Sequence, residues 1–99
     1  MGNLKAKGYR AEEVVQQRYE QRGYTLLHKN WTIPGGEIDL IMKKRGELVF
    51  VEVKLVDRTR DLENYVSARK LQVLERSIER YCAELDEEWE LRLDVVFVQ

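Results

Sequence analysis

Residues 37–55 read EIDLIMKKRGELVFVEVKL. Two runs rich in β-branched residues, 37–43 and 48–55, flank a polar turn at residues 44–47, and this pattern predicts a β-hairpin. A two-residue loop at Arg45 and Gly46, with glycine where a positive φ is often needed, would pair Lys44 with Glu47. Counting back along both strands from that pair places Asp39 opposite Glu52.

The two faces of this hairpin differ, because side chains alternate between faces along a strand. One face is wholly apolar and is expected to lie in the core; it carries Ile38, Leu40, Met42, Val49, Val51, Val53 and Leu55. The other face is apolar near the turn but charged at its far end, where it carries Glu37, Asp39, Glu52 and Lys54. Charges in an otherwise buried sheet need a partner or a purpose.

The opposed acids Asp39 and Glu52 are the informative part of this charged end. Directly opposed Cβ atoms lie about 5 Å apart, so the two carboxylates repel each other unless a proton or a cation lies between them. Mg²⁺ prefers carboxylate and water oxygens, and Lys54 on the same face would hold a water or a phosphate oxygen beside it. A simpler reading, cross-strand salt bridges from Lys54 to Glu37 or Asp39, explains part of the pattern. A one-residue slip in register would place the two acids on opposite faces.

The remaining chain predicts two helices and two further strands. Apolar residues recur at helical spacing over 8–22 and 65–85, and strands are expected over 24–31 and 91–98. The order α-β-β-β-α-β predicts an α/β fold with three layers, in which a mixed central sheet has a helix on each face.

Two charged residues flank the buried stripes of these helices. Glu12 lies beside Val15 and Tyr19 on the first helix, and Lys70 lies beside Leu71 on the second. Both can face the sheet, or they can be helix-edge charges that reach into solvent.

Composition sets the class of protein. A chain of 99 residues with 35% charged residues predicts one globular domain over 1–99. Because it has no long apolar segment, we expect the protein to be cytoplasmic and not associated with a membrane. Its net charge of −1 is unevenly distributed along the chain. Residues 1–70 contain 14 Lys/Arg and 10 Asp/Glu, whereas residues 71–99 contain 3 Lys/Arg and 8 Asp/Glu. The single histidine and single cysteine exclude a histidine-based metal cluster and an intrachain disulfide.

The motif GEIDLI at residues 36–41, followed by a short turn and FVEVK at 50–54, resembles the uncharacterised YraN family. That family is a branch of the PD-(D/E)XK, or restriction-endonuclease-like, nuclease superfamily, which also includes archaeal Holliday junction resolvases. Weaker similarities lie at residues 11–12, 23–24, 30–31, 66–70 and 93–96. The chain departs from the family after Lys54, where Leu55 and Val56 follow instead of Thr-Arg.

The resemblance implies a restriction-endonuclease-like fold and a Mg²⁺- or Mn²⁺-dependent endonuclease acting on DNA, with branched or junction DNA among the candidate substrates. Asp39, Glu52 and the Val53 carbonyl would bind the metal, Lys54 would activate or position the attacking water, and Glu12 would be an additional acid. Because related nucleases that cut two strands often dimerise, a homodimer is a further hypothesis.

Phosphate contacts are expected from basic residues near the site. Arg58 and Arg60 follow Lys54 in a loop, and Lys70 lies near the start of the second helix. Two other readings stay open. The chain could be a non-catalytic module on a nuclease fold that binds nucleic acid or protein, or an interaction protein whose hairpin charges are purely structural.

Overall fold

The computed structural model describes residues 4–56 and 67–99. Its elements follow one another as α1 (Leu4–Gln21), β1 (Thr25–Ile33), β2 (Gly36–Lys44), β3 (Glu47–Leu55), α2 (Ala68–Cys82) and β4 (Glu90–Val98). The predicted order α-β-β-β-α-β is confirmed. No helix in the two described ranges is long and apolar enough to cross a membrane.

The boundaries differ from the predicted ones mainly at helix ends. α1 begins at Leu4, so Gly8 lies inside the helix rather than at its start. α2 begins after Ser67, whose hydroxyl accepts a hydrogen bond from the backbone N–H of Lys70 at 3.2 Å. This is an N-cap, because the hydroxyl satisfies a donor that has no partner within the helix.

The four strands form one mixed sheet in the order β1-β2-β3-β4. β1, β2 and β3 are antiparallel neighbours, and β4 returns parallel to β3. The predicted hairpin register is confirmed from Lys44–Glu47 to Leu40–Val51. Arg45 and Gly46 both have positive φ, 48° and 81°, as a tight two-residue hairpin turn requires.

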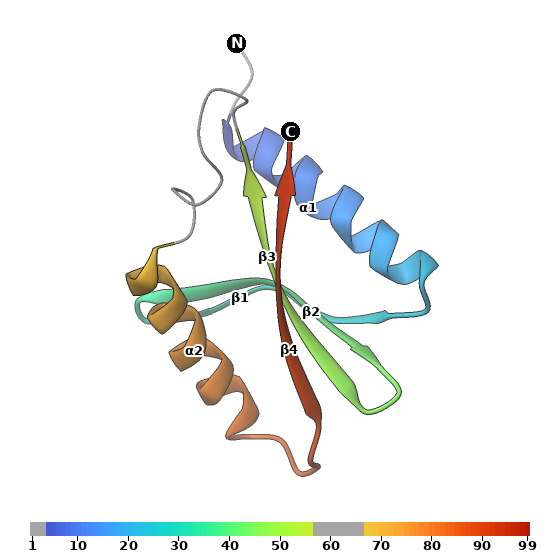
Figure 1. Ribbon diagram of the computed structural model, residues 1–99, viewed down its shortest axis with the longest axis vertical. Coiled ribbons are helices and arrows are strands. Elements are labelled where there is room, and N and C mark those ends of the chain that lie inside the picture. Colours follow the sequence, from blue (N-terminus) through green and yellow to red (C-terminus); the bar gives the residue numbers. More distant parts are fainter. Residues whose placement is uncertain (1–3, 57–66) are drawn as a thin grey trace.

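The helices lie on opposite sides of the sheet, which gives the three expected layers (Figure 1). The cluster under α1, here the α1 cluster, contains Val15, Tyr19, Leu40, Met42, Val49 and Val51. The cluster under α2, here the α2 cluster, contains Ile38, Ile41, Leu48 and Phe50, with Ile78, Tyr81 and Cys82 of α2 packed against it. The middle of the sheet is therefore buried on both faces, and a charged side chain there is costly.

Regular alternation along β2 breaks beside Asp39. Ile38 and Ile41 are three residues apart, yet both lie in the α2 cluster, whereas Leu40 lies in the α1 cluster. The prediction that Ile38 shares a face with Leu40 was therefore wrong, and so was the core position of Leu55, which is 38% exposed. Alternation needs a regular pleat. Asn30 lies on β1 between the partners of Leu40 and Ile38, and its φ of 52° is outside the range of a regular strand.

Candidate active site

Asp39 lies where the ladder between β2 and β3 ends. The last paired residues are Leu40 and Val51, and beyond them the two strands separate (Figure 1). The backbone N–H of Val53 donates instead to the Asp39 carboxylate, at 2.7 Å from Oδ2. A side chain has thus replaced a carbonyl as the acceptor, so the Asp39 carboxylate is held in the opening between the strands.

Glu12 of α1 lies beside this opening. Its side chain is 7% exposed, although it is charged in water at neutral pH. In the amide orientation that satisfies its neighbours, Asn30 of β1 donates to Oε1 of Glu12 at 3.1 Å and to Oε1 of Glu37 at 3.0 Å. The backbone of Asn30 has a φ of 52°, a left-handed value that asparagine tolerates better than most residues.

The acids at the opening perturb one another. Burial, followed by the charge and hydrogen bonding of Glu12, raises the pKa of Asp39 to about 6, against the opposing effect of the Val53 N–H. Burial also raises the pKa of Glu12. Two ionised carboxylates have no proton to share, and Oε2 of Glu12 is buried without a hydrogen-bond partner among the described residues. A proton or a cation between Glu12 and Asp39 would relieve the repulsion of their carboxylates and would give Oε2 of Glu12 a partner.

Glu52 and Lys54 form the second half of the cluster on β3. Their side chains make an ion pair of 2.9 Å while only 13% and 18% exposed. Burial and the charge of Asp39 raise the pKa of Glu52. Burial lowers the pKa of Lys54, but the neighbouring Lys70 and the ion pair with Glu52, together with the charge of Asp39, outweigh burial, so the net pKa is raised.

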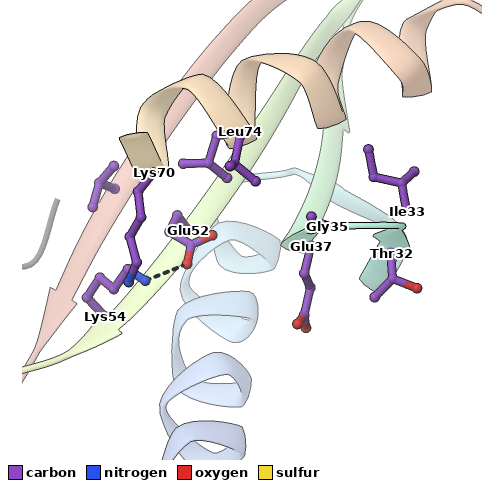
Figure 2. A pocket seen from close by; sticks show the side chains of 11 residues that line it. Thr32, Ile33, Gly35, Glu37, Glu52, Lys54, Lys70 and Leu74 are labelled. Atoms are coloured by element: carbon purple, nitrogen blue, oxygen red, sulfur yellow. Dashed lines mark ion pairs between the residues drawn. The ribbon is translucent and has the colours of Figure 1, made fainter. Parts of the chain in front are cut away.

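Lys70 extends from the first turn of α2 toward Lys54 and Glu52 (Figure 2). The nearby Lys54 ammonium group lowers the pKa of Lys70. Two lysine amines thus converge on a single carboxylate, that of Glu52. Such an excess of positive charge favours binding of an anion.

A pocket of about 510 Å³ opens beside these side chains (Figure 2). It lies between the turn joining β1 to β2, strand β3 and the first turns of α2. Its lining residues are Thr32, Ile33, Gly35, Gly36, Glu37, Glu52, Lys54, Lys70, Val73, Leu74 and Val95. The acids, the lysines and the pocket together form the candidate active site.

Comparison with known proteins places the chain in a family. The model of the uncharacterised protein family UPF0102 matches residues 11–98. The chain belongs to this family. A UPF0102 protein of Flavobacterium psychrophilum is 32% identical over 93 residues, which is 88% of this chain and 75% of the relative. A UPF0102 protein of Nitrosomonas eutropha is 35% identical over 103 residues, which is 99% of this chain and 86% of the relative.

The UPF0102 match contains every predicted site residue that the structure describes. Glu12 and Asp39 lie together at the strand opening, and Glu52, Lys54 and Lys70 lie together beside the pocket. Arg58 and Arg60 lie outside the described residues. Among the residues that are described, no three His, Cys, Asp or Glu side chains are gathered as a ready-made metal site.

Sequence reasoning missed the part that Asn30 plays. Its amide connects the acid of α1 to β2, but an isolated asparagine in an expected strand gives little signal. Asparagine is nevertheless depleted in strands and enriched at positive φ. That contrast, together with the weak family similarity at residues 30–31, was the available clue.

Proposed function

We propose that this UPF0102 protein is a metal-dependent endonuclease that hydrolyses phosphodiester bonds in DNA. The proposal is carried by the buried acid cluster, in which the charge of Glu12 raises the pKa of Asp39 and Oε2 of Glu12 is buried without a hydrogen-bond partner among the described residues. Burying two neighbouring acids costs folding free energy, and such costs are typical of functional sites. The resemblance of residues 36–54 to the PD-(D/E)XK motif supports the same reaction.

The residues present fit a divalent cation. Asp39 and Glu52 supply carboxylate oxygens, the Val53 carbonyl supplies a neutral oxygen, and Mg²⁺ commonly takes its other ligands from water and substrate phosphate. The unpartnered Oε2 of Glu12 and the raised pKa of Asp39 mark this region as short of positive charge. Mn²⁺ suits the same oxygen donors.

Each side chain then has a role. Asp39 and Glu52 would hold the ion, which when bound stabilises negative charge developing on the phosphate and lowers the pKa of a bound water. The Lys54 amine would position that water and contact a phosphate oxygen. Glu12 adds a second carboxyl beside Asp39, and Lys70 contributes positive charge toward the DNA backbone.

A second candidate is a module that binds nucleic acid without cutting it. The 2.9 Å ion pair between Glu52 and Lys54 favours this reading, because it neutralises one of the two proposed metal ligands. Under this alternative the lysines bind phosphate and no metal is needed.

The two candidates separate on metal affinity and cleavage. Mn²⁺ would be titrated by calorimetry into the wild type, Asp39→Asn and the matched control Asp86→Asn, which changes an exposed acid outside the cluster. The nuclease proposal expects binding in the wild type and control but not in Asp39→Asn, and Mg²⁺-dependent cleavage of DNA with the same pattern. DNA binding by all three proteins, without cleavage in Mg²⁺ or Mn²⁺, would establish the binding module instead.

A further inference from the structure

The pocket beside the acid cluster has two chemically different ends. Lys54, Lys70 and Glu52 lie together at one end, and Leu74 lies on the α2 wall between them and Ile33 (Figure 2). Val73 and Val95 complete the aliphatic part of the lining. A charged end that joins an aliphatic end suits a ligand that is itself both charged and apolar.

The charged end has more cations than its own anion can balance. Lys54 is paired with Glu52 at 2.9 Å, and Lys70 approaches the same two groups. If Glu52 binds a metal ion, both lysines lose that partner. A phosphate oxygen would then supply the missing negative charge.

A phosphate alone does not explain the aliphatic end. Phosphodiester oxygens gain nothing from Ile33, Val73 or Leu74, whereas the planar face of a nucleobase is apolar enough to displace water from them. The volume of about 510 Å³ is within the roughly 300–1,000 Å³ range of pockets that enclose a small organic group. Bases within an intact duplex are stacked and paired, so only an unpaired base can enter such a pocket.

We propose that this pocket holds one unpaired nucleotide of a DNA substrate, with its phosphate against Lys54 and Lys70 and its base against Ile33, Val73 and Leu74. The inference rests on the proposed function and names its substrate class. Single strands, flaps and branch points with unpaired nucleotides are substrates, and continuous duplex is bound only through its backbone.

Binding to matched DNA probes tests this directly. Fluorescence anisotropy would compare a short labelled single strand, the same strand with abasic residues in place of its central nucleotides, and the corresponding duplex. Ca²⁺ would replace Mg²⁺, and a gel would verify that the DNA stays intact. The first two probes carry equal charge, so a difference between them reports contact with the base. The expected result is about tenfold weaker binding of the abasic strand.

Two substitutions locate the effect in the pocket. Val73→Phe fills the aliphatic end and is expected to bring the normal and abasic strands to equal affinity. Val14→Phe makes the same change on α1, where Val14 is 45% exposed and outside the pocket lining, and should keep the tenfold ratio. If Val73→Phe does not fold, as judged by circular dichroism, the wild-type comparison of the two strands still decides.

The result is independent of cleavage. Equal binding of normal and abasic strands by the wild type, or no DNA binding at all, overturns the pocket inference. A base-dependent preference in a protein that never cuts supports the pocket while removing the nuclease proposal. Mg²⁺-dependent cutting with no base preference supports the nuclease proposal and overturns the pocket inference.

Discussion

At the residue scale, Asp39 is held by opposing interactions. The Val53 N–H stabilises its ionised form, whereas burial and Glu12 destabilise that form more strongly and raise the pKa from 3.8 to about 6. The folded protein therefore binds a proton at Asp39 more tightly than the unfolded chain does. Stability from this group is complete below about pH 4 and is lost as the pH rises through about 6.

This linkage predicts that the metal-free protein is more stable at pH 5 than at pH 7.5. The part due to Asp39 is on the order of 1 kcal/mol, because water screens a partly open site and reduces the full effect. Urea unfolding in EDTA would measure the difference, and Asp39→Asn should shrink it while Asp86→Asn should not. An equal pH dependence in wild type and Asp39→Asn would contradict the assignment.

Lys54 is the second residue with a separable role. If its amine positions the attacking water, Lys54→Met should lower the cleavage rate by about 100-fold or more while the Mn²⁺ affinity stays within a few-fold of wild type. Lys43→Met, an exposed lysine on β2, is the matched control. Loss of Mn²⁺ binding in Lys54→Met would assign Lys54 a structural role through its ion pair with Glu52.

At the element scale, the pocket depends on how closely α2 packs on the start of β2. Gly36 lies against α2, where an added Cβ would clash with the fully buried Ser77 hydroxyl and approach side-chain atoms of Ile33 and Val73 to 3.3 Å. Ser77 is fixed because its hydroxyl donates to the Val73 carbonyl at 2.9 Å. Only glycine at position 36 allows this approach.

Gly36→Ala is therefore predicted to destabilise the protein by about 1–3 kcal/mol, as overpacking does in other cores. Thermal unfolding would measure it, and Ser77→Ala in the same chain should recover part of the loss by removing the nearest obstacle. Gly35→Ala is the informative comparison: its Cβ meets nothing within 4 Å, so its cost comes from a φ of +83° and Ser77→Ala should not reduce it. Equal effects of Ser77→Ala on both glycine variants would rule out the proposed clash.

The hairpin was predictable because its information is local. Residues 44–47 set the turn, and the turn sets the register as far as Leu40 and Val51. The predicted pairing of Asp39 with Glu52 lies beyond the end of that ladder, although the charge of Asp39 still acts on Glu52. The break beside Asp39 was not predictable in this way. It depends on Asn30 of the neighbouring strand and on Glu12 of a helix, and neither contact can be deduced from the periodicity of β2.

At the scale of the whole molecule, the candidate ligands meet only when the sheet has formed. Asp39 and Glu52 lie on different strands, and each helix covers its own face of that sheet (Figure 1). In an unfolded chain Asp39 and Glu52 are not held close together, so a divalent ion that binds both of them binds the folded state selectively. Metal binding and global stability are then thermodynamically linked.

The linkage gives a prediction for thermal unfolding. At a free Mn²⁺ concentration 100 times the dissociation constant, the stabilisation is about 2.7 kcal/mol, which should raise the melting temperature by about 13 °C for a domain of this size. Asp39→Asn should show no such rise, and Asp86→Asn should match the wild type. A calorimetric Mn²⁺ signal with an unchanged melting temperature would mean that the ion binds equally well to the unfolded chain, and the site formed by the sheet would have to be abandoned.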